Sequence, residues 1–470
     1  MAKYKDLFDF WYLELIEKLG RLGDFVSESA ERAAYKTRGK PRIVQEFEQG
    51  IAQEAGRLAK SVVLYLSVRD DEESLSRYSH MLLNDATHAS RTFQVDHSRL
   101  QRFPADWVPE ELYVFVDDVC RGVRWPGKSK FEPISTLGTI ALDDRYDFGE
   151  LNRARWERMR PVATPTGEIK ETLFLLPKAE KNNPVAWPML VHEIGHALLS
   201  GDETIGPARE TLGKLAKTEI WGPEVAAKWA REIAADLFAA DVLGPVYLLA
   251  FISLAITMRT HHLMMPTPSH PPPRIRVDYI LDRLARLDLG SSGPNMADLN
   301  RHLDRLYTRG TLDHEARNRY EELPRGLESS EDIRTAVQRA VEQVICSDGY
   351  SALDIPLFGE SDYMRALRLV DQRLVELVPI GSFREELHYR PQEIRRKREE
   401  AARALSEEPN SISQIVTAAA VYKIRNGLDS LRNIVEPEDG FQSFHRKRRG
   451  FDLLVTKSME MALIHQFYVT

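Results

Sequence analysis

Apolar residues recur at helical spacing through the first hundred residues of this chain. The stretch over residues 7–19 places apolar side chains three and four residues apart, and the stretch over residues 43–68 has the same period. Apolar positions with this spacing share one face of a helix. We therefore predict a helical region over residues 1–102.

The pattern changes near residue 103. Short apolar stretches follow, bounded by Pro, Gly and Asp residues that favour turns; they cover residues 112–116, 134–142 and 172–176. Such stretches predict β-strands, and together they predict a small sheet. Residues 185–290 return to helical patterns, so we expect the sheet to back a group of helices.

The most apolar stretch covers residues 246–258, and Asp241, Gly244 and Pro245 precede it. It is shorter than the roughly 20 residues that a transmembrane helix needs. We therefore expect a buried core helix and no stable membrane insertion. A segment that dips into a membrane is the alternative.

Beyond residue 290, Gly, Ser and Pro residues over 290–294 predict a linker. Helical patterns then resume over residues 296–308, 329–346, 362–378, 391–406 and 411–433. The predicted fold class is α+β, predominantly α-helical. Its predicted divisions are an N-terminal helical region (1–102), a middle domain of sheet and helices (103–290) and a C-terminal helical region (291–470).

One motif dominates the chemistry of the sequence, the segment H-E-I-G-H at residues 192–196. Residues four apart lie on the same face of a helix, so His192 and His196 can bind one metal ion. Glu193 is offset around the helix, where it can act as general base on a metal-bound water. Pro188 suits the first turn of this helix, and its apolar flanks predict burial. The motif predicts a Zn²⁺ site; the alternative is a helix with two surface histidines.

A catalytic zinc site needs a third protein ligand. Glu232 is one candidate, because it lies in an Ala-rich stretch typical of a helix and Asp236 follows one turn later. Asp236 could accept the free N–H of a ligand histidine and orient the ring. Asp202 is the other candidate. Its offset from His196 fits the metzincin pattern, although that pattern has Gly where this chain has Leu199.

H-E-x-x-H followed by E-x-x-x-D resembles the gluzincins, a class of zinc peptidases. The segment S-H-P-P-P-R-I-R-V at residues 269–277 is similar to a segment of the CaaX-processing and heat-shock zinc-endopeptidase family. The resemblance covers roughly residues 170–290. It implies a zincin-like core, a small sheet with zinc-binding helices, within the middle domain.

The resemblance also implies roles for single residues. It assigns zinc binding to three of them: His192, His196 and Glu232. Glu193 would be the general base, and Asp236 would support a ligand histidine, His192. His270 would lie beside the substrate as an oxyanion stabiliser or proton donor, and Arg276 stands at the arginine position of the family. Members of that family are usually integral membrane proteins, so their membrane substrates are not carried over to this chain.

A site of this kind would hydrolyse a peptide bond with a zinc-activated water. Zn²⁺ lowers the pKa of the water to about 7, and Glu193 would carry the proton to the leaving amine. The oxyanion needs a further donor, for which His270, Arg276 and Tyr279 are the local candidates. The strand predicted over residues 171–177 either pairs with an extended substrate as an edge strand or is buried in the sheet without such a role.

Composition narrows the class of protein further. Of 470 residues, 43% are hydrophobic and 29% are charged, which is typical of a soluble globular protein. The net charge of −7 gives no general attraction to nucleic acid, so we expect no nucleic-acid partner. The basic run at residues 445–449 is expected to be a surface loop.

Cys120 and Cys346 lie far apart, and the charged N-terminus lacks a secretory pattern, so we expect a cytoplasmic protein.

The sequence therefore predicts a cytoplasmic zinc metallopeptidase, with an endopeptidase acting on a protein or peptide as the leading hypothesis. The C-terminal helical region would control access or bind a regulatory protein. Two alternatives stay open. One is a zinc hydrolase of a small amide metabolite, and the other is a helical interaction protein without catalysis.

Overall fold

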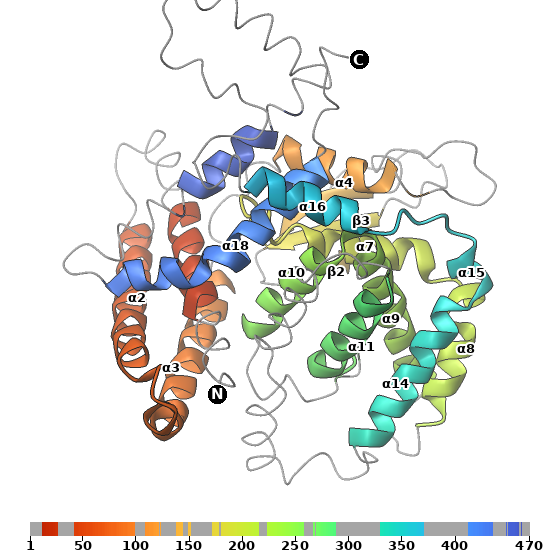
Figure 1. Cartoon of the computed structure of the whole chain (residues 1–470), viewed down its shortest axis with the longest axis horizontal. Helices are drawn as coiled ribbons and strands as arrows, with labels where there is room; N and C mark the ends of the chain where they lie inside the picture. The colour runs from red at the N-terminus through yellow and green to blue at the C-terminus, as the bar shows by residue number, and fades with distance from the viewer. Residues whose placement is uncertain are drawn as a thin grey trace, which may run out of the picture.

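The structure is a computed structural model, and its description covers these residues: 12–26, 42–98, 109–121, 123, 138–143, 149–151, 172–177, 180–215, 223–257, 267, 269–287, 330–370, 412–435, 448, 450–459 and 462. The linker expected at 290–294, the helices expected at 296–308 and 391–406 and most of the basic run lie outside these ranges. The described part of the chain is predominantly helical, as predicted (Figure 1).

Helices make up most of the described part of the chain, and one group of three short strands lies between the N-terminal helices and the later ones. The elements, in order, are a helix over residues 12–26, α2 (Arg42–Val68), α3 (Glu72–Ser98), α4 (Glu110–Arg121), β1 (Gly138–Asp143), β2 (Gly149–Leu151), β3 (Thr172–Pro177), α7 (Pro188–Leu199), α8 (Asp202–Gly213), α9 (Pro223–Leu243), α10 (Pro245–Thr257), α11 (Pro273–Arg286), α14 (Ser330–Ile345), α15 (Asp348–Ser351), α16 (Glu360–Leu369), α18 (Ile412–Val435) and a helical stretch over 450–459. α2 and α3 lie together at one side of the molecule, while α7, α9, α10 and α11 lie near its centre (Figure 1).

The three strands form one small sheet in the order β1-β3-β2. β3 pairs in parallel with β1 and antiparallel with β2. The strand predicted over 172–176 is therefore present as β3, and residues 138–142 of the strand predicted over 134–142 lie in β1. α7 packs against β3 and β2. Because β3 is the central strand, the hypothesis that it offers a free edge to an extended substrate is wrong for this sheet.

The stretch at residues 112–116 is helical, which corrects the predicted strand. It lies in α4, where Leu112, Phe115, Val116 and Val119 are buried. Their spacing of three and four residues marks one face of a helix. Five consecutive apolar residues fit the period of a strand as well as that of a helix. Val119, one helical turn after Val116, is the residue that favours the helix.

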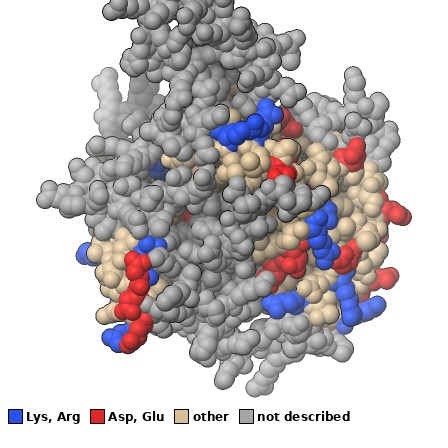
Figure 2. Space-filling model, in the orientation of Figure 1, with Lys and Arg blue, Asp and Glu red and all other residues tan. Residues whose placement is uncertain are grey.

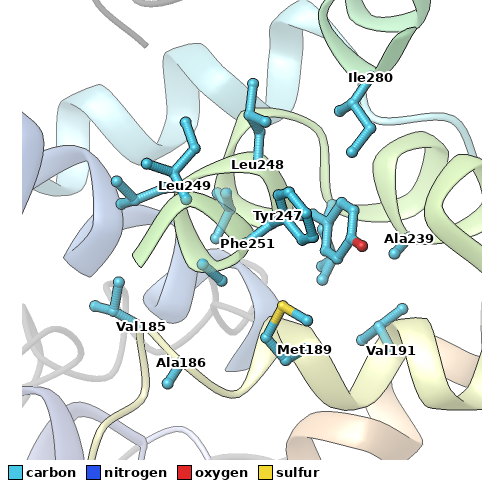
Figure 3. Close-up of a cluster of buried hydrophobic side chains, with 14 of the residues drawn as sticks. Val185, Ala186, Met189, Val191, Ala239, Tyr247, Leu248, Leu249, Phe251 and Ile280 are labelled. Carbon is cyan, nitrogen blue, oxygen red and sulfur yellow. The ribbon is translucent and has the colours of Figure 1, made fainter. Parts of the chain in front are cut away.

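α10 is the buried core helix that residues 246–258 predicted. It packs against α7, α9 and α11, and it also contacts α3 and α18. Met189 and Val191 of α7 lie in the same apolar cluster as Leu248, Leu249 and Phe251 of α10 (Figure 3). Among the described residues, no helix is both long and apolar enough to span a bilayer.

Buried ion pairs join the N-terminal and C-terminal helices to this core. Lys18, in the helix over residues 12–26, lies 3.0 Å from Glu180, and both side chains are buried. Lys423 of α18 pairs with Glu14 and, at 2.7 Å, with Glu17. Buried apolar residues from all three predicted regions belong to one core cluster.

The described surface carries both signs of charge side by side (Figure 2). Several surface groups are paired: Arg77 with Glu73 on α3, Arg209 with Asp202 on α8, and Arg286 of α11 with Glu342 of α14. Charges of mixed sign cancel over short distances, so the described part of this face has no extended field of one sign.

Candidate metal centre

α7 and α9 approach each other closely at the H-E-x-x-H motif. A Cβ added to Gly195 would lie 2.8 Å from the Cα of Ala235, closer than a side chain can come to a backbone atom. Glycine is therefore needed at this position of α7 for the helices to pack as they do. The approach brings the carboxylates of α9 against the histidines of α7.

Two imidazoles and one carboxylate converge at this contact. Glu232 Oε1 lies 3.2 Å from His196 Nε2, and Glu232 Oε2 lies 3.4 Å from His192 Nε2. The two histidine rings are nearly perpendicular, with centroids 4.6 Å apart. In a tetrahedral zinc site with bonds of about 2.0–2.1 Å, neighbouring ligand atoms are about 3.3 Å apart. Each observed separation is close to that edge length, with a different oxygen of Glu232 facing each histidine.

A buried carboxylate oxygen also faces this point. Glu232 Oε2 is buried and meets no hydrogen-bond geometry among the described residues, while nitrogens of Arg276 and His192 lie 3.2 and 3.4 Å from it. Buried carboxylates are paired with cationic groups or bind metal ions. Imidazole nitrogen and carboxylate oxygen are both zinc ligands, so the residues present fit Zn²⁺ held by two histidines and one glutamate.

Glu193 belongs to the same group. One ligand atom from each of His192, Glu193 and His196 lies within 4.8 Å of the others. Glu193 is buried and follows His192 directly on α7. This places a carboxylate beside the histidine pair, where a general base would be needed.

Asp202, the other candidate for a third ligand, has a different environment. It is the first residue of α8, is largely exposed, and its carboxylate lies 2.8 Å from Arg209. Glu232 contacts both histidines of the motif, whereas Asp202 forms an ion pair with Arg209 at the surface. The geometry therefore brings Glu232 to the site.

Asp236 is bonded by side chains from three other helices. Its Oδ1 lies 2.9 Å from His192 Nδ1 and accepts a hydrogen bond from the Tyr247 hydroxyl of α10. Arg276 of α11 binds both oxygens, at 2.6 and 2.7 Å, and the Tyr279 hydroxyl donates to Oδ2. With Nδ1 turned to Asp236, His192 directs Nε2 toward Glu232.

Arg276 and Tyr279 are thereby bonded to carboxylates. The Arg276 side chain is buried, lies over the Phe251 ring at 4.6 Å and comes within 3.2 Å of Glu232 Oε2. The Tyr279 hydroxyl is bonded to Asp236. Both were candidates for an oxyanion donor, and the structure shows their polar groups bonded to Asp236.

His270 reaches the site from the segment before α11. Its Nε2 lies 3.4 Å from Glu232 Oε1, and its side chain is about half exposed. The loop that holds it is closed by three hydrogen bonds between Thr267 and His270, and the carbonyl of Thr267 accepts from the Trp229 indole at 3.0 Å. Prolines 271 to 273 follow, so His270 projects from a short, constrained segment.

The charges of the site shift the pKa values of its members. Burial by itself lowers the pKa of His192, but the hydrogen bond and charge of Asp236, with Glu232, outweigh it and raise the pKa to about 10. Burial would raise the pKa of Glu232, yet His270, His196 and Arg276 hold it well below its usual range. Burial, together with the charge of Arg276, outweighs the opposing charge of Glu232 and lowers the pKa of His270, which favours its neutral form.

Tyr247 is the member of this site that the sequence did not indicate. It lies in the apolar stretch that predicted only a core helix, and it is fully buried. Its hydroxyl bonds to Asp236 and lies 3.1 Å from His192 Nδ1. One signal was available: a tyrosine in a buried helix needs a partner for its hydroxyl.

Comparisons of this chain with known protein families, with curated proteins and with solved structures find no match. The resemblance to gluzincins therefore stands on the motif residues of the sequence alone.

Proposed function

We propose that this chain is a zinc-dependent peptidase of the gluzincin type, with a zincin-like core formed by the small sheet, α7 and α9. The observation that carries the proposal is the Glu232 carboxylate, which reaches both His192 Nε2 and His196 Nε2 at 3.4 and 3.2 Å. Three protein ligands with an open fourth position are typical of catalytic zinc, whereas structural zinc has four.

The chain's own residues would divide the reaction among them. Bound Zn²⁺ would supply an acidified water and a polarised carbonyl. Glu193 would take the proton of that water as it attacks the scissile carbon, and would then deliver it to the leaving nitrogen. Asp236 would keep the Nδ1–H of His192 engaged so that Nε2 stays a ligand.

His270 is the group best placed to stabilise the oxyanion in this proposal. Its Nε2 lies 3.4 Å from Glu232 Oε1, and its side chain is about half exposed. As a neutral imidazole it retains one N–H that can donate to a developing negative charge. Arg276 is assigned a positioning role, since its guanidinium is bonded to Asp236.

A zinc hydrolase of a small amide is the second candidate. The position of β3 favours it, because a central strand offers no free edge for an extended peptide. A peptide would have to pair along β1 or β2 at the outside of the sheet. The two candidates share the same metal site and the same catalytic residues.

The compartment that we propose is the cytoplasm. Cys346 is a free, exposed thiol, and its only possible partner in the chain, Cys120, is far away in the sequence. An exposed thiol of this kind persists most readily in a reducing environment.

The decisive experiment compares the peptides released from a proteome by the wild type and by Glu193→Gln. The substitution keeps the size of the side chain and removes the base, so the variant should retain stoichiometric zinc and lose turnover. New cleavage products with the wild type alone would support a peptidase.

Zinc analysis on the same samples separates the remaining possibilities. Zinc present in both proteins with no difference in peptides would reject the peptidase and leave the amide hydrolase, to be tested on a metabolite extract. A wild type that binds no zinc would reject both, and would leave the helical interaction protein.

A further inference from the structure

Tyr247 lies at the junction of two helices that turn back on each other. α9 ends at Leu243, Gly244 adopts a left-handed conformation with φ of +58°, and α10 begins at Pro245. Glycine adopts this conformation without strain, and proline suits the first turn of a helix. This short turn returns Tyr247 to Asp236, eleven residues earlier on the preceding helix.

The hydroxyl of Tyr247 contacts both members of the carboxylate–histidine pair. It donates to Asp236 Oδ1, the oxygen that faces His192, and it lies 3.1 Å from His192 Nδ1. The tyrosine ring is also almost parallel to the His192 ring, at an angle of 7°. The ring centroids are 6.1 Å apart, so the restraint comes from the hydroxyl, whose contact with Nδ1 limits the choice of hydrogen-bond partner for the imidazole.

Tyr279 offers a natural comparison within the same network. Its hydroxyl donates to Asp236 Oδ2, the oxygen that does not face His192. Both tyrosines are buried. They differ in one respect that matters here, because Tyr247 contacts the histidine as well as the carboxylate.

We propose that Tyr247 is a positioning residue for the metal ligand His192. It keeps the imidazole plane and the Nδ1–H directed at Asp236, so that Nε2 is ready to bind the metal. The proposal rests on the metal site of the proposed function. It adds that the metal affinity of this chain depends on a hydroxyl group that makes no contact with the metal.

The test compares Tyr247→Phe with Tyr279→Phe in the full chain. Each substitution removes one hydroxyl and keeps the ring, so each takes one bond from Asp236. Zn²⁺ affinity is measured by competition with a chromogenic chelator, and the geometry of the site by the visible spectrum of the Co²⁺ form. Thermal unfolding of the metal-free proteins reports the structural cost of each change.

Tyr247→Phe should weaken zinc affinity by about 10-fold or more, as loss of partners around a ligand histidine typically does, and it should shift the Co²⁺ bands. Tyr279→Phe should have the smaller effect on both readouts. If metal-free Tyr247→Phe does not fold, the same comparison is made by the rate at which the metal-loaded proteins lose zinc to the chelator.

Three results would overturn the proposal. Unchanged affinity and spectrum in Tyr247→Phe, with a wild type that binds zinc, would reject it and leave the proposed function intact. Equal losses in the two variants would show that the tyrosines act only through Asp236. A wild type that binds neither Zn²⁺ nor Co²⁺ would reject the metal site itself.

Discussion

Asp236 accepts bonds from four side chains, and this explains how a buried carboxylate can stay ionised beside the candidate metal site. Burial alone would raise its pKa, yet Arg276 and His192 lower it below the usual range. An ionised Asp236 can hold the Nδ1–H of His192 over a wide range of pH. These bonds fix the position of Asp236, and holding a binding group in place in advance reduces the cost of organising a site.

Glu232 and Asp202 differ enough to be tested against each other as the third ligand. Glu232→Gln should weaken zinc affinity by more than about 100-fold, above the usual effect of a residue outside the ligand set. Asp202→Asn is the matched control, since it removes an exposed carboxylate paired with Arg209. It should leave affinity unchanged. Zinc content after dialysis measures both, and loss of zinc in Asp202→Asn alone would contradict the assignment.

Zinc binding should release a proton from His192. Its pKa of about 10 means that the metal-free imidazole is protonated at pH 7, and a metal can bind only the deprotonated nitrogen. The raised pKa also implies that the charged His192 stabilises the metal-free fold fully below pH 6.5, and that this contribution is lost as the pH rises through about 10.

Calorimetric titration of the protein with Zn²⁺ at pH 7 tests this release. Two buffers with different ionisation enthalpies should give heats that differ by the enthalpy of at least about one proton. Heats that are the same in both buffers would show that His192 is already neutral. The thermal midpoint of the metal-free protein is the second check, and the contribution of His192 to it should decrease between pH 7 and pH 10.

At the scale of elements, the site depends on how closely α7 and α9 pack. Gly195→Ala would add a methyl group 2.8 Å from the Cα of Ala235, and backbone atoms cannot move aside as a flexible side chain can. The gain in helix propensity is at most about 1 kcal/mol, whereas overpacking costs about 1–3 kcal/mol. We therefore expect a net loss of stability, with weaker zinc binding because Glu232 moves away from the histidines.

Gly56→Ala is the control for this prediction. Gly56 lies in α2, and an added Cβ would meet nothing within 4 Å. The substitution should raise stability by about 0.5–1 kcal/mol through helix propensity alone. Denaturant unfolding measures the change in the free energy of unfolding for both variants, which should have opposite signs. A stabilised Gly195→Ala with normal zinc affinity would contradict the close approach of α7 and α9.

At the scale of the whole molecule, residues near the N-terminus are joined to the segment that precedes α7. Lys18 and Glu180 lie 3.0 Å apart with both side chains almost fully buried. Asn183 donates a hydrogen bond to the other oxygen of Glu180, five residues before α7 begins. This arrangement connects the helix over residues 12–26 to the start of the motif helix.

Lys18→Met should therefore destabilise the protein strongly. It breaks a buried ion pair by removing one partner, which typically costs about 3–5 kcal/mol. Arg77→Met removes an exposed pair with Glu73 and should change stability by less than about 1 kcal/mol. Thermal unfolding distinguishes the two, and similar midpoints for both variants would show that the buried pair contributes little.

The sequence by itself determined the helical character of the chain and the chemistry of its main site. Spacings of four residues on single helices relate His192 to His196 and Glu232 to Asp236, and such pairs follow from the period of the helix alone. The apolar content of residues 246–258 likewise determined a buried helix. These features are local, so one stretch of sequence is enough to specify them.

Only the tertiary structure decided the features that depend on contacts between helices and strands. The choice of Glu232 over Asp202 depends on the packing of α7 against α9, and the role of Tyr247 depends on the turn at Gly244. The central position of β3 depends on strand pairing, and α4 is a helix because one of its faces is buried. Residues distant in the sequence meet only after packing, and no local period encodes which of them will do so.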